Sequence, residues 1–161
     1  MKAPLSWIKD YIDLEGIGIE DLANILTSVG LEVEDILLVG VEKPAGHLKN
    51  KYAGLSWDKE KFVVAEVVEV NQHPNADRLT LCELNDGTGI TTVLTGAPNM
   101  FPWVGKGRLE QPLRVAYARE GAVLYDGHQP GQVVTKLKKT TIRGVESRSM
   151  ICSEKELGIS E

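Results

Sequence analysis

The stretch FVVAEVVEVNQHPNADRLTLCELNDGTGITTVL, residues 62–94, decides the fold, because runs of β-forming residues alternate in it with turn residues. Such runs predict three short strands, at residues 62–70, 78–84 and 90–94. His73-Pro-Asn-Ala-Asp77 predicts the first turn, with the His73 side chain capping it, and Asn85-Asp86-Gly87 is typical of a hairpin turn. The stretch therefore predicts consecutive strands joined by tight turns.

Two later segments, 113–117 and 133–142, predict further strands of the same kind. Five short strands within about ninety residues are typical of a small barrel or sandwich. Residues 96–112 are longer than an ordinary loop and carry Phe101 and Trp103. We expect this segment to cover one end of the barrel or to pack against a neighbour.

The N-terminal region has a different texture and predicts helices. Apolar residues at 22, 25, 26 and 29 follow helical spacing, and Gly30 stands where a helix commonly ends. Residues 31–36 then alternate like a strand, whereas the segment 41–60 predicts a linker. At the other end, Ser153 and Glu156 have the spacing of a capping box, which predicts a short helix.

Composition limits the class of protein. The chain has 161 residues, of which 42% are hydrophobic and 25% charged, as in a globular domain. Its two cysteines, Cys82 and Cys152, form no CxxC pair, which favours a reducing cytosol over a disulfide framework or a zinc site. No apolar run reaches the roughly 20 residues of a membrane span, and the acidic, amphipathic start does not resemble a signal peptide. We therefore expect a cytoplasmic protein without a membrane partner.

The net charge of −5 is unevenly distributed. Residues 1–42 contain nine acids and two bases, whereas residues 43–161 contain fourteen acids and sixteen bases. Between 131 and 150 only Glu146 opposes a basic group formed by Lys136, Lys138, Lys139, Arg143 and Arg148. A local basic patch can bind a polyanion despite an acidic total, because screening confines each field to about 10 Å. The alternative is an ordinary solvated face.

Catalytic and metal sites are weakly indicated. Gly87-Thr-Gly89 and Gly105-Lys-Gly107 lack the spacing and the strand–glycine–helix context of a phosphate-binding loop. His73, Asp77 and Cys82 could be imagined as metal ligands, but no second cluster completes the set, and a turn explains His73 better. We expect no catalytic residue, no metal and no cofactor in this chain.

Four short sequence motifs follow one another in the barrel region. They are His73–Leu79 (HPNADRL), Thr95–Asn99 (TGAPN), Glu120–Leu124 (EGAVL), and Ile142–Ser147 (IRGVES) followed by Met150–Glu154 (MICSE). Together they resemble the tRNA-binding domain that several aminoacyl-tRNA synthetases and small tRNA-binding proteins share. Two flanking motifs, Leu5–Tyr11 and Leu26–Glu34, are similar to the first residues of the β subunit of bacterial phenylalanyl-tRNA synthetases.

This resemblance implies a β-dominated α+β fold. A five-stranded OB-fold barrel would be inserted in a small, incomplete helical domain that the two chain ends form. The implied organisation is listed in chain order: 1–40, the N-terminal part of a split α/β domain; 41–60, a linker; 61–152, the tRNA-binding barrel; 153–161, the start of the returning segment.

The resemblance also implies a function. The chain would be a non-catalytic tRNA-binding and assembly module of a phenylalanine–tRNA ligase, with the chemistry in a partner α subunit of an α2β2 enzyme. ATP and Mg²⁺ would serve the full enzyme in protein biosynthesis. The implied partner is the phenylalanine-specific tRNA, not DNA.

OB folds bind RNA in a groove across their second and third strands, through backbone charge and stacking. On this pattern the expected RNA-binding residues are Asn75, Arg78, Lys136, Lys138, Lys139, Arg143, Ser147 and Arg148. Arg78 has an alternative role in an internal ion pair with Asp77 or Glu83. Aromatic residues for stacking are scarce, and Tyr117 alternates like a core residue, so we expect weak, shape-led binding.

Two other functions stay open at this level. The barrel could be purely architectural within the synthetase, contacting other domains of the β subunit or the α subunit. Alternatively, the chain could be a free-standing tRNA-binding protein that acts as a dimer. The flanking motifs Leu5–Tyr11 and Leu26–Glu34 disfavour this second alternative, because free-standing tRNA-binding proteins lack such an N-terminal sequence.

Overall fold

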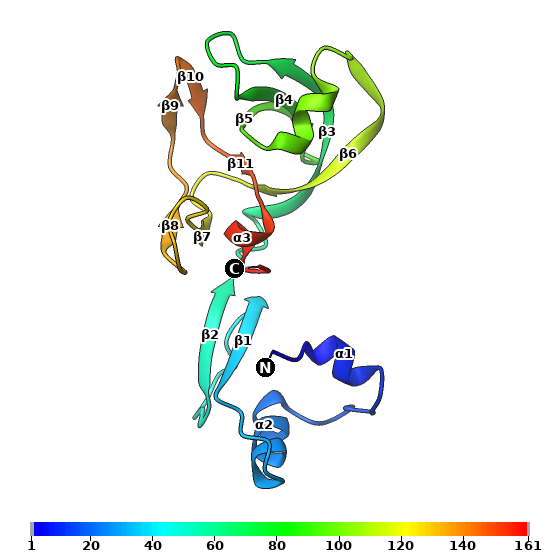
Figure 1. Cartoon of the computed structure of the whole chain (residues 1–161), viewed down its shortest axis with the longest axis vertical. Coiled ribbons are helices and arrows are strands. Elements are labelled where there is room, and N and C mark those ends of the chain that lie inside the picture. The colour runs from blue at the N-terminus through cyan, green and yellow to red at the C-terminus, as the bar shows by residue number, and fades with distance from the viewer. Residues whose placement is uncertain (1, 161) are drawn as a thin grey trace. The chain divides into compact units, whose positions relative to one another are not determined.

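The computed structural model describes residues 2–160, which form two compact units (Figure 1). One unit comprises the residues up to Leu38 together with Lys43–Ala53. The other comprises Val39–Glu42 together with the chain from Gly54 onward, and it contains the barrel. No helix within residues 2–160 is long and apolar enough to cross a membrane.

The N-terminal unit holds two helices, α1 (Leu5–Lys9) and α2 (Ile19–Ser28). The apolar spacing predicted α2 correctly, with Leu22 buried on its inner face and Gly30 in the left-handed region after its end. The Glu20 side chain fastens α2 to a later segment, because its Oε2 accepts hydrogen bonds from the Lys49 amide at 3.3 Å and from Asn50 Nδ2 at 3.0 Å.

The strand predicted at 31–36 was wrong. The amide of Leu31 donates to the carbonyl of Leu26 at 2.9 Å, so the residues after α2 serve to end the helix. The strand β1 instead spans Asp35–Gly40 and pairs with β2, Lys51–Ser56, in a two-stranded sheet. Part of the segment 41–60, expected as a linker, is therefore ordered as β2.

The barrel is a five-stranded sheet in the order β11-β6-β3-β4-β5, with every neighbouring pair antiparallel. Its strands are β3 (Phe62–Gln72), β4 (Thr80–Asn85), β5 (Ile90–Thr95), β6 (Arg108–Ala118) and β11 (Met150–Ile151). The last strand, β11, also contacts β5 at the opposite edge, so the sheet nearly closes on itself. The predicted β-dominated, OB-like barrel is confirmed.

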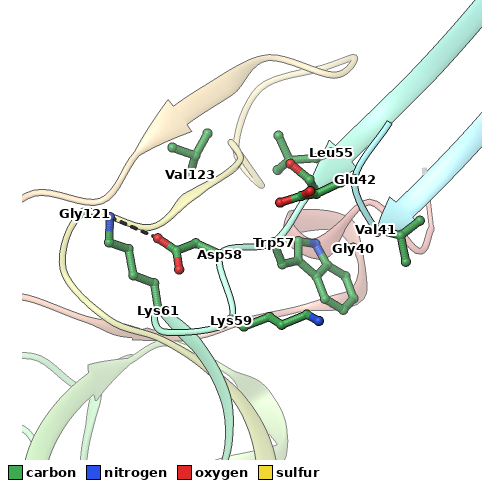
Figure 2. A pocket seen from close by; sticks show the side chains of 11 residues that line it. Gly40, Val41, Glu42, Leu55, Trp57, Asp58, Lys59, Lys61, Gly121 and Val123 are labelled. Carbon is green, nitrogen blue, oxygen red and sulfur yellow. Dashed lines mark ion pairs between the residues drawn. The ribbon is translucent and has the colours of Figure 1, made fainter. Parts of the chain in front are cut away.

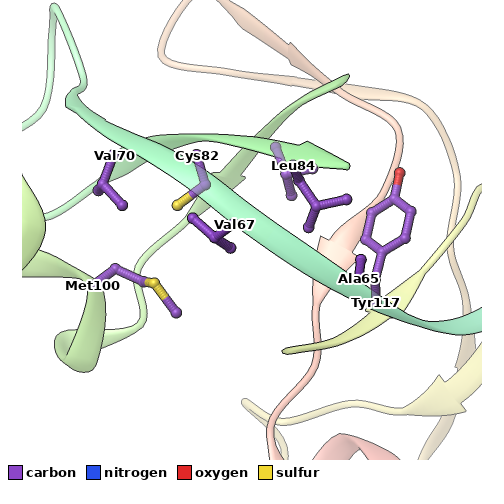
Figure 3. Packing of buried hydrophobic residues seen from close by; sticks show 8 residues of the cluster. Ala65, Val67, Val70, Cys82, Leu84, Met100 and Tyr117 are labelled. Carbon is purple, nitrogen blue, oxygen red and sulfur yellow. The ribbon is translucent and has the colours of Figure 1, made fainter. Parts of the chain in front are cut away.

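A β-bulge in β3 gives the barrel its curvature. The register of β3 against both β4 and β6 shifts between Val67 and Glu69. The extra residue bends the strand and moves its inward face from Ala65 and Val67 to Val70, which are all buried. Figure 3 shows these side chains converging with Cys82, Leu84, Met100 and Tyr117 in the core.

The long segment 96–112 was expected to cover one end of the barrel or to pack against a neighbour, and in the structure it packs against the barrel core. It forms a 3₁₀ helix, η1 (Pro98–Trp103), whose Met100 is buried in the core while Trp103 packs partly against it. The amide of Gly105 then donates to the carbonyl of Val70 at 3.1 Å, which fastens the segment to β3.

The segment 133–142 supplies strands, as predicted, but it forms two short ones with different partners, and neither lies in the five-stranded sheet. β8 (Val134–Lys136) pairs with β7 (Val123–Tyr125). β9 (Thr140–Ile142) instead pairs with β10 (Val145–Ser147), and the two form a separate hairpin.

The C-terminal helix α3 (Glu154–Leu157) begins with the predicted capping box between Ser153 and Glu156, which is confirmed. Its Leu157 is buried, and α3 contacts β7 of the barrel unit. The pairing of the two chain ends in one domain stays a prediction.

Candidate nucleic-acid interface

The turn between β3 and β4 is held by its own side chains. The backbone amide of Asn75 donates to Nδ1 of His73 at 3.0 Å, so His73 caps the turn as predicted. Gln72 Nε2 donates to the carbonyl of Ala76 at 3.1 Å across the same turn. His73 is buried at 2% exposure, whereas Asn75 and Arg78 are exposed. The turn therefore presents these two side chains to solvent on a fixed backbone.

The tip of the β9–β10 hairpin lies against this turn. Ile142 pairs with Val145, so Arg143 and Gly144 form a two-residue loop, with φ values of 51° and 88°. Two left-handed residues are the mark of a type I′ turn. Asn75 Nδ2 donates to the carbonyl of Arg143 at 3.3 Å. The two sequence motifs that contain Asn75 and Arg143 are thus in contact in the folded chain.

The same hairpin lies beside the edge of the barrel sheet. β10 contacts β5, which is the third strand of the barrel. The hairpin residues of the predicted basic group are thereby placed next to the strands expected to form an OB groove. Their electrostatic state then decides what this surface can bind.

Glu146 neutralises part of the basic group. Its carboxylate forms ion pairs with both Lys139 and Arg148. The hydrogen bonds from Lys139 and then Arg148 hold the pKa of Glu146 below its ordinary value, so this carboxylate stays charged near neutral pH. The predicted group of five cations is therefore less basic than its composition indicates.

The remaining cations of the basic group have no acidic partner among residues 2–160. Within residues 2–160, the structure shows no ion pair for Arg78, Lys136, Lys138 or Arg143, and all four are exposed. The alternative role of Arg78 in an ion pair with Asp77 or Glu83 is thus not formed. These side chains are free to contact phosphate.

Ser147 is a poorer candidate than the cations. It is half-buried, and its hydroxyl donates to the carbonyl of Ser149 at 3.4 Å. Arg148, its neighbour, is exposed but already paired with Glu146. Contact of either side chain with RNA requires these interactions to be exchanged.

Aromatic stacking has few surfaces here. Tyr117 and Tyr125 are each only 5% exposed, and Phe101 and Trp103 are half-buried. The ring of Trp103 is also covered by the ammonium of Lys106, 5.0 Å from its centroid. Tyr117 is a core residue as predicted. The surface therefore offers charge and hydrogen bonds more than stacking.

The metal ligands considered from the sequence do not assemble. Cys82 lies in the barrel core with no exposed surface, and burial raises the pKa of its thiol. Across residues 2–160 no group of three or more His, Cys, Asp or Glu side chains could hold a metal ion.

The sequence shows Glu146 as the one acid among these bases, but not its direct ion pairs with Lys139 and Arg148. Once Arg143-Gly144 is read as a two-residue turn, the hairpin register places Glu146 opposite Thr141 and diagonal to Lys139. Diagonal neighbours on one face of a hairpin are within reach of long side chains. An Arg-Gly pair is a weak sequence signal for a type I′ turn, because Arg seldom adopts a positive φ.

Comparison with known proteins bears on this surface. Residues 62–108 match a family described as "Putative tRNA binding domain". The whole chain is 41% identical to a phenylalanine–tRNA ligase beta subunit of Dehalococcoides mccartyi strain CBDB1, of which it spans 16%. It is 38% identical over its full length to that of Rhodospirillum rubrum, and 37% identical over 96% of its length to that of Geobacter metallireducens.

The chain spans about a sixth of the length of these relatives, since it covers 16% of each full-length match. The matched tRNA-binding segment runs from the first residue of β3 to the first of β6, and so includes the Asn75 turn. The chain is similar over its whole length to the N-terminal region of phenylalanine–tRNA ligase beta subunits, and residues 62–108 of its barrel match a putative tRNA binding domain.

Proposed function

We propose that this chain is a non-catalytic module that binds tRNA through the surface formed by the Asn75 turn and the β9–β10 hairpin. The contact between Asn75 and the Arg143 carbonyl carries this proposal. It joins the turn, which lies in the segment matched to the tRNA-binding domain, to a hairpin whose tip residue, Arg143, has no ion pair among the described residues.

The charges at this surface support phosphate as the primary target. Arg78, Lys138 and Arg143 are exposed without an acidic partner in the described chain. Each phosphate contact releases condensed counterions, so affinity falls with salt. Asn75 and the Arg143 loop add hydrogen-bonding groups of fixed geometry, which suit an irregular, partly single-stranded RNA.

The proposed setting is a cytoplasmic phenylalanine–tRNA ligase of α2β2 composition. In that enzyme the chain contributes tRNA binding and assembly, while the α subunit uses ATP and Mg²⁺ to attach phenylalanine. The similarity to beta subunits over the whole chain supports this setting. The chain itself requires no cofactor on this proposal.

Gel-shift titration of the 161-residue chain with tRNA tests the function. We expect binding that weakens as salt rises, and a lower affinity when Lys136, Lys138 and Lys139 are replaced together by Ala. Unchanged binding by this triple variant refutes the basic surface. Absence of any shift at low salt favours the architectural role instead.

Two comparisons separate the alternatives. Phenylalanine-specific tRNA is titrated beside a second tRNA, since a preference supports recognition of the proposed partner. Sedimentation tests the free-standing reading, because the proposed module is expected to be a concentration-independent monomer. A tight dimer favours the free-standing tRNA-binding protein.

A further inference from the structure

A second pair of cations meets near the start of β3. Lys61 directly precedes β3, and Lys136 is the last residue of β8. A Cβ placed on Gly121 would lie 3.5 Å from the Lys61 Nζ and 3.9 Å from the Lys136 Cε. Two lysines that are far apart in sequence therefore converge over a residue without a side chain. Figure 2 shows the ammonium of Lys61 directed toward Gly121.

Backbone hydrogen bonds hold this arrangement together. The Arg119 amide donates to the Lys61 carbonyl at 2.8 Å, which ties the turn before Gly121 to the start of β3. The Gly121 amide donates to the Leu137 carbonyl, also at 2.8 Å, which ties the same turn to the end of β8. Gly121 itself has a φ of 83°, a conformation that side chains disfavour. The two lysines thus project from a fixed frame.

The charge at this point is only weakly compensated. The Lys61 Nζ lies 3.3 Å from Asp58 Oδ2, but both side chains are substantially exposed, at 38% and 47%, and such pairs contribute little. Lys136 forms no ion pair with any residue from 2 to 160. Lys61 and Gly121 line a hollow of about 840 Å³, together with Lys59 and the acidic Glu42 and Asp58. An anion held between Lys61 and Lys136 would be attracted by both ammonium groups.

This site continues the surface already described. Lys138 lies two residues beyond Lys136 in the chain, and the intervening Leu137 packs against the apolar cluster of Ala118, Ala122 and Leu124. The stretch from Lys136 to Arg143 can span at most about 25 Å. Lys61 lies directly before the first residue of β3, and Asn75 lies three residues after the last residue of that strand, Gln72. The cations therefore line a course between the two ends of β3.

We propose that Lys61 and Lys136 hold a phosphate group of the bound RNA strand above Gly121. The RNA then crosses the barrel from the Asn75 turn to Gly121, along Lys138 and Arg143. Lysine suits this role because its ammonium is a compact charge on a flexible stem. The missing side chain at Gly121 leaves room for the phosphate. This inference rests on the proposed tRNA binding and adds a second contact point to it.

Lys61→Met and Lys136→Met test the site, since methionine retains the stem and removes the charge. We expect each variant to lower tRNA affinity about threefold to tenfold at low salt. Each variant should also reduce the slope of log affinity against log salt by about 0.7 to 0.9. Lys106→Met is the matched control, because Lys106 precedes β6 and Gly121 follows that strand of 11 residues.

A second measurement guards against variants that misfold. In the unaltered chain, the NMR signal of the Gly121 amide should shift when tRNA is added, and the signal of Gly30, which follows α2, should not. Thermal unfolding of both lysine variants should match that of the unaltered chain, because neither side chain is buried.

The outcomes distinguish this site from the proposed function. If both lysine variants retain full affinity and salt slope while Arg143→Ala loses affinity, the Gly121 site is refuted and tRNA binding stands. If the unaltered chain binds no tRNA at low salt, the proposed function and this inference are both refuted. A Gly121 signal unmoved by saturating tRNA also overturns the site.

Discussion

The side-chain amide of Asn75 donates a 3.3 Å hydrogen bond to the backbone carbonyl of Arg143, 68 residues further along the chain. It fastens the β3–β4 turn to the tip of the β9–β10 hairpin. One neutral hydrogen bond contributes about 1 kcal/mol. It therefore holds the hairpin tip in place without strongly affecting the barrel as a whole.

Replacing Asn75 with Ala should loosen the hairpin tip selectively. We expect hydrogen exchange of the β9–β10 amides to accelerate about fivefold, which corresponds to the loss of about 1 kcal/mol. Exchange in β3 and β4 should be unchanged. Asn71→Ala, at an exposed site on β3, is the control. Equal acceleration in both variants would contradict a specific link between Asn75 and the hairpin.

Replacing Arg143 with Asn should change stability and binding in opposite directions. Arg143 has a φ of 51°, which Asn tolerates better than Arg, so we expect the free energy of unfolding to rise by up to about 1 kcal/mol. Affinity for tRNA should fall and its salt slope should decrease by about 1, since one phosphate contact is lost. Chemical denaturation and tRNA titration at several salt concentrations measure the two effects. Parallel losses of both would indicate a merely structural side chain.

Replacing Glu146 with Gln should strengthen RNA binding. The carboxylate of Glu146 pairs with Lys139 and Arg148, so its removal releases two cations. We expect tRNA affinity to increase about threefold to tenfold at low salt, with a steeper salt dependence. Glu110→Gln, on an exposed part of β6, makes the same change in net charge and should have a smaller effect. Equal gains in both variants would reduce the effect to net charge alone.

Acid should release the end of the β4–β5 hairpin. Asp86 accepts hydrogen bonds from the Thr88 hydroxyl at 2.6 Å and from Arg119 Nε at 2.9 Å. The Thr88 hydrogen bond first, and then Arg119, lower the pKa of Asp86 to about 2. A lowered pKa stabilises the fold above the unfolded value near 4, and this contribution is lost as pH falls from about 4 to about 2.

Asp86→Asn should therefore flatten the loss of stability between pH 4 and pH 2 that the unaltered chain shows, because the titrating group is removed. At neutral pH it should cost about 1–3 kcal/mol, as expected when a hydrogen-bonded charge is lost. Thermal unfolding followed across this pH range provides the measurement. A variant with the same pH dependence as the unaltered chain would exclude Asp86 as the source.

Gly40→Ala should destabilise the barrel unit. Gly40 has a φ of 73°, and a Cβ there would lie 2.5 Å from the nearest atom of the Trp57 ring. Strain and steric overlap together should cost about 2–4 kcal/mol. Gly107→Ala is the matched control, since Gly107 has a φ of 71° and no atom within 4 Å of the added Cβ. Equal losses of unfolding free energy would show that Trp57 adds nothing.

The strands and turns of the barrel were largely predictable because their signals are local. The β-forming runs flanking the Asn75 turn, the Asn85-Asp86-Gly87 hairpin and the Ser153–Glu156 capping box depend on neighbouring residues. The misplaced strand at 31–36 and the division of 133–142 into two strands have a non-local cause. Residues 31–33 are used to end α2, and residues 133–142 are divided between two partner strands.

The sequence alone determined the barrel, the Asn75 turn and the presence of a basic group, because strand pattern, turn chemistry and charge are written in consecutive residues. Only the tertiary structure decided which cations are free. Glu146 lies beside Lys139 because of the hairpin register, and Lys61 and Lys136 both lie near Gly121 because backbone hydrogen bonds bring three separate segments together there. Local sequence signals do not encode such contacts, since they depend on how strands distant in the chain are paired.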